Sequence, residues 1–139
     1  MGREIGISDW LRISQERIAL FAEVTEDRQW IHLDRVRATA ESPYRTTIAH
    51  GFLTLSLISH FLKEVIQIDG GARFAVNYGL SRVRFPAAVK SDSRIRARVV
   101  LQAVKESMDS VEVTYSVTVE SEGLDKPNCV AEWLVRYYS

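Results

Sequence analysis

Two residues with proton-handling side chains lie five positions apart in the segment Asp27-Arg28-Gln29-Trp30-Ile31-His32. Five helical steps of about 100° would place them roughly 140° apart, so one helix cannot bring them together. A chain that leaves a helix near Asp27 and turns before His32 could do so. The carboxylate would then act as a general base toward water, with the imidazole as its partner or as a proton donor. The alternative is that Asp27 ends a helix and His32 is an ordinary loop histidine.

A second segment, Ala49-His50-Gly51-Phe52, opens a long apolar stretch and could start a helix. A helix N-terminus presents unpaired N–H groups, which suit an enolate oxygen formed when a nucleophile adds to an unsaturated thioester. Glycine at position 51 would let a carbonyl approach the backbone closely. The alternative is that Gly51 only permits a tight turn, with His50 capping or packing nearby.

Composition sets the class of protein. The 139 residues suit one domain, residues 1–139, with a real hydrophobic core. Eighteen Lys+Arg balance eighteen Asp+Glu, which argues against nucleic-acid binding. The single cysteine, Cys129, fits a reducing compartment, and no apolar signal segment opens the chain. Polar residues interrupt the apolar stretch 52–68, so no membrane span is expected. We therefore expect a soluble cytoplasmic domain.

Two short helices are predicted before residue 43. Ser14 can cap the first, which should fray near Thr25-Glu26-Asp27, where side chains compete for backbone hydrogen bonds. Asp34 can cap the second, which should stop before Ser42-Pro43 because the residue preceding proline avoids helical geometry. Both helices would flank the Asp27 to His32 segment.

The main helix is predicted to begin at Gly51 and to end at Gly70-Gly71. Its apolar residues cover most of the circumference, so we expect burial on several sides. They are Phe52, Leu53, Leu55, Leu57, Ile58, Phe61, Leu62, Val65 and Ile66.

The rest of the chain is predicted to form strands. Apolar and polar residues alternate over residues 94–101 and 111–120, a last strand covers 129–138, and one or two more lie in 72–85, ended by Pro86. A helix followed by antiparallel strands indicates an α+β layer structure with the sheet wrapped on the helix. Exposed sheet edges would favour pairing with a second copy, and hence a homodimer.

Several other residues have candidate roles. Arginines could face the phosphates of a nucleotide-like carrier, although such alternation is more typical of a solvated strand face; they are Arg82, Arg84, Arg94, Arg96 and Arg98. Cys129 is predicted to be buried and inert, and His60 to be a core or interface residue. The spacing of Asp27, His32, His50 and His60 matches no metal-ligand pattern, so no metal is expected.

The combined motif resembles the MaoC-like dehydratase family, which includes the (R)-specific enoyl-CoA hydratases. The resemblance is carried by residues 21–34, by Thr47-Ile48-Ala49-His50-Gly51-Phe52-Leu53-Thr54, and by Asn77-Tyr78-Gly79-Leu80 with Val83-Arg84-Phe85-Pro86-Ala87. It covers nearly the whole chain, and the Gln-Trp-Ile-His wording is most similar to a nodulation-protein-N-like branch. Asp-x(4)-His followed by Ala-His-Gly is far more specific than either half.

The resemblance implies a hot dog fold, in which an antiparallel sheet wraps a long central helix, and a homodimer with active sites near its interface. It implies that Asp27 and His32 activate water and that the Gly51 amide stabilises the oxyanion. The implied reaction is reversible syn hydration of a trans-2-enoyl-CoA to an (R)-3-hydroxyacyl-CoA. The resemblance implies no metal or redox cofactor, and coenzyme A enters as part of the substrate.

The chain departs from the family pattern in three places. Gln29 and Trp30 stand where many relatives have Asn-Pro, Thr54 replaces a common serine, and Glu26 stands where glycine is frequent. Gln29, Trp30, Thr54 and His50 are candidate substrate-binding residues. We therefore expect these departures to alter the range of substrates more than the chemistry. Two alternatives stay open: a hot dog acyl-CoA thioesterase, and a non-catalytic acyl-thioester-binding module.

Overall fold

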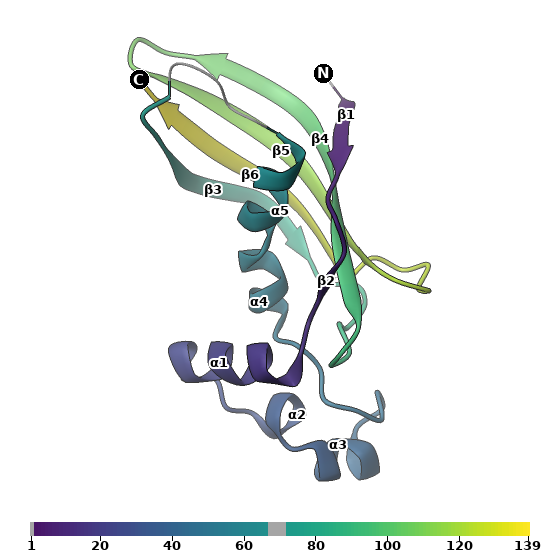
Figure 1. Ribbon diagram of the computed structural model, residues 1–139. Helices are drawn as coiled ribbons and strands as arrows, with labels where there is room; N and C mark the ends of the chain where they lie inside the picture. The colour runs from purple at the N-terminus through teal and green to yellow at the C-terminus, as the bar shows by residue number, and fades with distance from the viewer. Residues whose placement is uncertain (1, 67–71) are drawn as a thin grey trace.

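The computed structural model describes residues 2–66 and 72–139, and its centre is one antiparallel sheet. The strand order is β1-β4-β5-β6-β3, and β2 also pairs with β4. Helices α4 and α5 lie against the concave face of this sheet, whereas α1, α2 and α3 gather beyond one end of it (Figure 1). The strands are β1 (Arg3–Ile7), β2 (Leu11–Arg12), β3 (Phe74–Arg84), β4 (Arg94–Glu106), β5 (Ser110–Ser121) and β6 (Cys129–Tyr138). The predicted α+β class is confirmed.

Alternation along the long strands separates a buried face from a charged one. On β4 and β5 the buried side chains include Ile95, Val99 and Val117, which face the helix. The polar face is crossed by ion pairs, such as those from Arg96 and Arg98 to Glu120. The run Arg94 to Arg98 therefore forms a solvated strand face with acidic partners, as the more typical reading of its alternation predicts.

The N-terminal strands β1 and β2 were not predicted. They pair with β4, with Arg3 opposite Leu101 and Leu11 opposite Ile95. Both strands are short, and β1 lacks a clean alternation, so their conformation depends on pairing with a distant strand rather than on local pattern. Gly6 lies so close to α5 that an added Cβ would be 2.7 Å from a methyl carbon of Val65.

The predicted main helix is present as two segments, α4 (Gly51–Ser56) and α5 (Ile58–Val65). Leu57 joins them with αR geometry and donates its N–H to the Leu53 carbonyl, so the second segment follows directly from the first. The helix ends at Val65, and the predicted stop at Gly70-Gly71 lies outside the described residues. The predicted burial on several sides holds for most of its apolar residues, but Phe52 is 68% exposed and one side of the helix stays open.

The helices before residue 43 match the predicted caps. Helix α1 (Gln15–Thr25) begins where the Ser14 hydroxyl accepts from the Arg17 amide at 3.1 Å, and it ends at Glu26 in left-handed geometry with φ of 66°. Helix α3 (Arg35–Glu41) is capped by Asp34. Between them lies α2 (Trp30–Leu33), a single turn that was not predicted. No helix in residues 2–66 and 72–139 is long and apolar enough to cross a membrane.

Candidate active site

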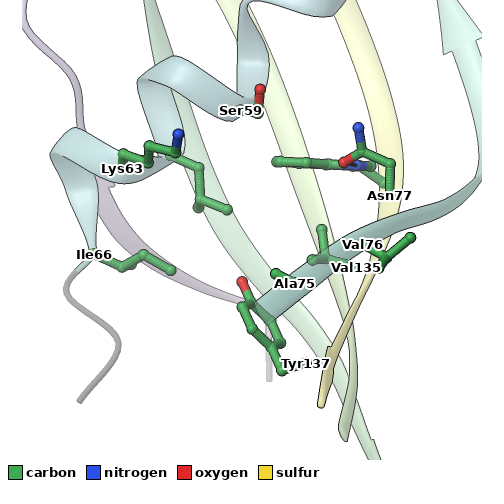
Figure 2. A pocket seen from close by; sticks show the side chains of 10 residues that line it. Ser59, Lys63, Ile66, Ala75, Val76, Asn77, Val135 and Tyr137 are labelled. Carbon is green, nitrogen blue, oxygen red and sulfur yellow. Dashed lines mark hydrogen bonds between the residues drawn. The ribbon is translucent and has the colours of Figure 1, made fainter. Parts of the chain in front are cut away.

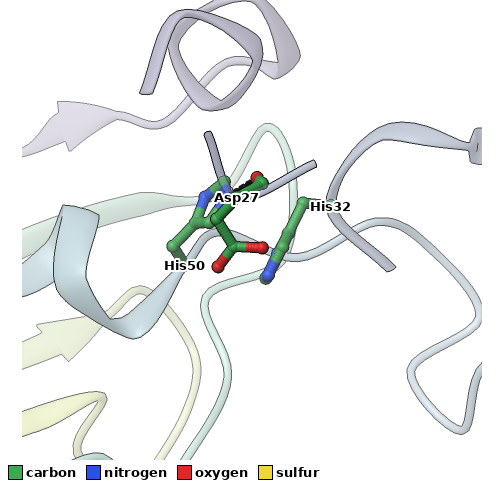
Figure 3. A group of neighbouring side chains, drawn as sticks. All are labelled: Asp27, His32 and His50. Carbon is green, nitrogen blue, oxygen red and sulfur yellow. Dashed lines mark hydrogen bonds between the residues drawn. The ribbon is translucent and has the colours of Figure 1, made fainter. Parts of the chain in front are cut away.

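Three side chains that can bind protons come from separate segments and meet where the group of helices α1 to α3 adjoins the start of α4. Asp27 lies in the loop after α1, His32 lies in α2, and His50 directly precedes α4. Each offers one nitrogen or carboxylate oxygen, and these atoms lie within 4.8 Å of one another. Figure 3 shows the Asp27 carboxylate beside both imidazole rings. We refer to these three residues as the Asp27–His32–His50 cluster.

The turn predicted between Asp27 and His32 is present. The Asp27 carboxylate accepts from the Gln29 amide at 3.4 Å, and the Gln29 carbonyl accepts from the His32 amide at 3.1 Å. The chain thus reverses through the single turn of α2 rather than continuing α1. Arg28 points outward and binds Glu26 and Glu23. A local hydrogen-bonded turn therefore brings the carboxylate and the imidazole together.

The hydrogen bond of His32 fixes its tautomer. Its Nδ1 lies 2.7 Å from the Ile48 carbonyl oxygen, which can only accept, so Nδ1 carries the hydrogen and Nε2 carries a lone pair. Burial lowers the pKa of His32 below its usual value, and the Ile48 carbonyl, which favours the cation, offsets this only in part. His32 is therefore neutral near pH 7, with Nε2 able to accept a proton.

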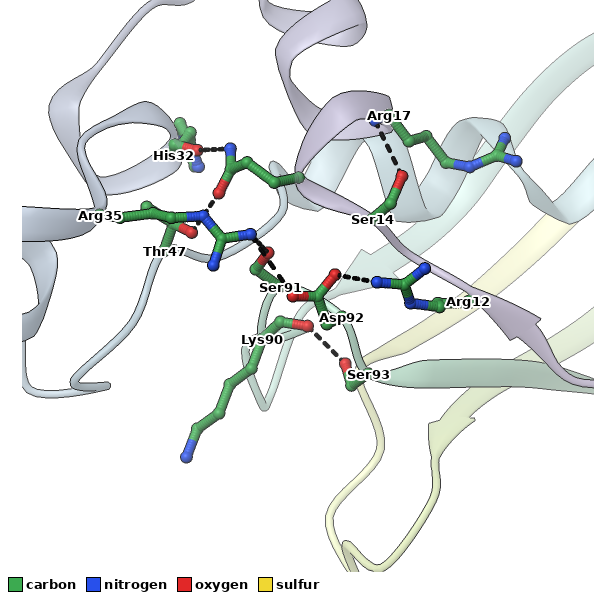
Figure 4. Close-up of polar contacts among 11 residues, drawn as sticks. Arg12, Ser14, Arg17, His32, Arg35, Thr47, Lys90, Ser91, Asp92 and Ser93 are labelled. Carbon is green, nitrogen blue, oxygen red and sulfur yellow. Dashed lines mark hydrogen bonds and ion pairs between the residues drawn. The ribbon is translucent and has the colours of Figure 1, made fainter.

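Gln15, which the sequence did not single out, supports this arrangement from α1. Its amide nitrogen donates to the His32 carbonyl at 2.7 Å, and its amide oxygen accepts from the Thr47 hydroxyl. Figure 4 labels both partners, His32 and Thr47. Gln15 thereby ties α1 to α2 and to the segment that leads into His50. No local signal marks such a residue, because its partners lie 17 and 32 positions away.

Gly51 is the first residue of α4, where an amide N–H has no partner within the helix. Among the described residues, no acceptor bonds to this N–H. An added Cβ would lie 3.1 Å from the Phe85 ring, so glycine leaves room at a tight contact. The predicted helix start at Gly51 is confirmed, whereas the binding of an oxygen by its amide stays a prediction.

One cavity of about 430 Å³ joins the two sequence motifs, since the cluster and Gly51 all line it. Thr54 instead lines a neighbouring cavity of about 190 Å³ that shares Gly51 and Phe85. Gln29 is exposed, and Trp30 lies under the Arg37 guanidinium at 4.1 Å, so neither side chain lines the larger cavity. The remaining lining residues of the larger cavity are Phe21, Thr25, Phe52 and Phe85.

A metal ion would find three ligand atoms in the cluster, although the sequence spacing had suggested no convergence. The His32 and His50 rings are stacked, with centres 3.7 Å apart and planes 21° from parallel. A metal binds along a nitrogen lone pair in the plane of the ring, so two stacked rings cannot both point at one ion without rotating. The expectation that no metal is bound stays a prediction.

Two residues outside the cluster complete the set of candidates. His60 was predicted in the core or an interface, but its side chain is 49% exposed, with Glu64 at 3.8 Å, so the core prediction was wrong. Its position falls on the open side of α5, which the apolar pattern did not reveal. Cys129 is fully buried, and burial raises the pKa of its thiol to about 11, as expected for an unreactive cysteine.

Comparison with known proteins places this site in a family. The family described as MaoC like domain matches residues 1–122. The chain is 49% identical over 137 residues to 3-hydroxyacyl-thioester dehydratase Z of Mycobacterium tuberculosis, an alignment that covers 98% of this chain and 89% of that protein. It is 44% identical to nodulation protein N of Rhizobium meliloti, over 96% of this chain and 84% of the relative.

Among solved structures, the R-hydratase PhaJ1 of Pseudomonas aeruginosa superposes with a TM-score of 0.77 at 24% identity. The alignment covers 100% of this chain and 82% of that one. At this identity the likeness is one of fold, and it confirms the predicted hot dog arrangement. The match over residues 1–122 and the two relatives above show that the chain belongs to the MaoC-like dehydratase family.

Proposed function

We propose that the protein is an (R)-specific enoyl-CoA hydratase, which adds water reversibly and syn to a trans-2-enoyl-CoA. The observation that carries this proposal is the position of His32, whose Nδ1 is bonded to the Ile48 carbonyl and which lies beside the Asp27 carboxylate in a cavity that also contains Gly51. Relatives named as a 3-hydroxyacyl-thioester dehydratase and, over 42% of the chain, as a 3-hydroxybutyryl-CoA dehydratase support the same chemistry.

A water molecule can donate one hydrogen to Asp27 and the other to His32, because a carboxylate and a lone-pair nitrogen are both acceptors. This leaves an oxygen lone pair to attack C3 of the substrate. As the C3–O bond forms, one O–H bond breaks and its proton moves to His32 Nε2. The adjacent Asp27 carboxylate then stabilises the imidazolium.

The electrons of the C2–C3 double bond move toward the thioester oxygen, where negative charge develops. The Gly51 amide is the donor proposed to stabilise this oxygen. Return of the electrons forms the C2–H bond with the proton held by His32. The proton and the hydroxyl group thus reach one face of the substrate from one site, which accounts for syn addition. The step balances with water alone, so we propose no metal or redox cofactor.

Two further cavities lie along one side of the central helix, between the helix and β3, and suit an acyl chain. The volumes are about 250 and 400 Å³, and both cavities are bounded by Ser59, Asn77 and Trp133. Trp133 is held by a hydrogen bond from its indole N–H to the Asn77 side chain at 3.1 Å. Figure 2 shows Ser59 and Lys63 on the helix, facing β3 across the cavity of about 400 Å³. We call this pair of cavities the α4–α5 groove.

Ser59 tests whether the α4–α5 groove holds the acyl chain, because this small side chain lines both cavities. In Ser59→Leu, kcat/KM for a ten-carbon enoyl-CoA should fall on the order of 10-fold, while crotonyl-CoA should change less than about 2-fold. The neighbouring exposed residue provides a control, His60→Leu, which adds bulk outside the groove. Equal losses on both substrates would contradict this placement.

We propose that the protein acts as a homodimer paired through β3. This strand is at one end of the sheet order, and it exposes a row of large apolar side chains. An apolar edge strand of this length is normally covered by another chain. The exposed side chains are Phe74, Val76, Tyr78 and Leu80.

Introducing charge on β3 should therefore convert the dimer to a monomer. Val76→Glu places a carboxylate in the proposed interface, where burial of an unpaired charge is unfavourable. Val36→Glu is the matched control, because Val36 is 83% exposed on α3. Light scattering after size exclusion should give the mass of a dimer for wild type and Val36→Glu. A dimeric Val76→Glu variant, or a monomeric wild type, would refute the interface.

The experiment that tests the proposed function runs the reaction backwards. The protein should form the conjugated enoyl thioester from (R)-3-hydroxybutyryl-CoA but not from the (S) isomer. Preference for the (S) isomer would overturn the stereochemical assignment.

We propose that the reaction takes place in the cytoplasm, in keeping with a single cysteine that is buried as a free thiol.

A further inference from the structure

We propose that His50 is a positioning residue, which holds the Asp27 backbone with one ring nitrogen and the His32 ring with its face. The inference rests on the proposed function, in which Asp27 and His32 handle the proton. It departs from the sequence-based expectation that His50 contacts substrate. His50 is 3% exposed, which leaves little surface for a ligand to touch.

The first contact fixes the loop that carries Asp27. His50 Nε2 lies 2.9 Å from the Asp27 carbonyl oxygen. Because a carbonyl only accepts, Nε2 carries a hydrogen and donates it to this oxygen. His50 Nδ1 is buried without a hydrogen-bond partner among the described residues, so the Nε2 contact alone orients the ring by hydrogen bonding. This contact joins the loop after α1 to the residue that precedes α4.

The second contact fixes the orientation of His32. The two imidazole rings stack with centres 3.7 Å apart, and Phe21 packs against His50 with ring centres 5.0 Å apart. His32 therefore cannot swing toward His50 without displacing a packed ring. Together with the bond from His32 Nδ1 to Ile48, this stacking keeps Nε2 directed at the site.

His50 also links the two halves of the site along the chain. It is the N-cap residue of α4, yet its side chain makes no capping hydrogen bond and reaches back to Asp27 instead. The next residue is Gly51, whose amide is the proposed oxyanion donor. One residue thus sets the position of the carboxylate, the imidazole and the start of α4 relative to one another. Displacements of about 1 Å in such a site can cost on the order of 10²-fold in rate.

Two variants separate the contacts of His50. His50→Gln keeps an N–H donor near the position of Nε2 but removes the ring, whereas His50→Phe keeps a ring but leaves the Asp27 carbonyl without its donor. We expect kcat to fall about 10-fold or more in His50→Phe, with KM within about 3-fold, and His50→Gln to recover part of the loss. Wild-type kcat in both variants would overturn the proposal. A KM raised more than about 10-fold at unchanged kcat would instead assign His50 to substrate binding.

A second measurement does not depend on turnover. Burial lowers the pKa of His32, and His50 lowers it further, while Asp27 acts in the opposite direction. Asp27 and His50 are the titratable groups that line the cavity together with His32. In His50→Gln the His32 ring should titrate at higher pH than in wild type, as followed by NMR of labelled imidazole. An unchanged or lower midpoint would contradict the contact even if the protein catalysed no hydration, so the two proposals fail separately.

Discussion

Replacing Asp27 by asparagine, or His32 by alanine, is expected to lower the turnover of enoyl-thioester hydration by at least about 10²-fold in each case. Asp27→Asn keeps the shape of the side chain but removes the negative charge that stabilises the imidazolium. His32→Ala removes the Nε2 lone pair that accepts the proton from water. Because the two groups act on one water molecule, the double variant should be little worse than the poorer single variant.

Steady-state kinetics with a trans-2-enoyl-CoA, together with circular dichroism to verify folding, provides the measurement. His60→Ala is the control for His32→Ala, because His60 is exposed on α5 and should tolerate the change at wild-type turnover. Hydration retained in both folded variants, Asp27→Asn and His32→Ala, would remove these residues from the mechanism.

Deleting the amide hydrogen of Gly51 is expected to have the second large effect. Gly51→Pro removes the N–H at the first position of α4, where proline fits a helix. The preceding His50 has φ of −61° and ψ of 138°, which suits a residue before proline. Loss of one oxyanion donor typically costs about 10²–10³-fold in kcat.

Gly51→Ala is the matched variant, because it adds a similar carbon near the Phe85 ring but keeps the N–H. Its kcat should fall less than about 10-fold, so the ratio between the two variants isolates the donor from the crowding. Comparable kcat values in the proline and alanine variants would show that the Gly51 amide does not stabilise the transition state.

Local rules predicted the parts of the fold that local interactions control. The Ser14 and Asp34 side chains cap α1 and α3 where expected, and alternation located β4 and β5. The N-terminal strands depend on pairing with β4, roughly 90 residues away, so no local pattern could reveal them. The exposure of Phe52 on the central helix was not predicted, because hydrophobicity alone cannot tell a face packed on the sheet from a face left open for another partner.

The site was predictable to a similar extent. The turn between Asp27 and His32 could be expected because one helix cannot unite them, and a tight turn is the simplest alternative. The proximity of His50 could not, because it depends on long-range bonds such as those from the Ile48 amide to Ile31 and from the Ala49 amide to Val89. The same limit hid Gln15, whose role exists only once α1, α2 and Thr47 are assembled.

The central claim is that the protein adds water to the double bond of an enoyl thioester rather than to its carbonyl. The most direct test follows the enoyl-thioester absorbance of crotonyl-CoA and of a longer trans-2-enoyl-CoA, with free thiol measured in parallel. The account predicts that absorbance is lost without thiol release and that the (R)-3-hydroxy product forms. Thiol release would identify a thioesterase, and no change with either substrate would point to a non-catalytic binding module; either result would contradict the account.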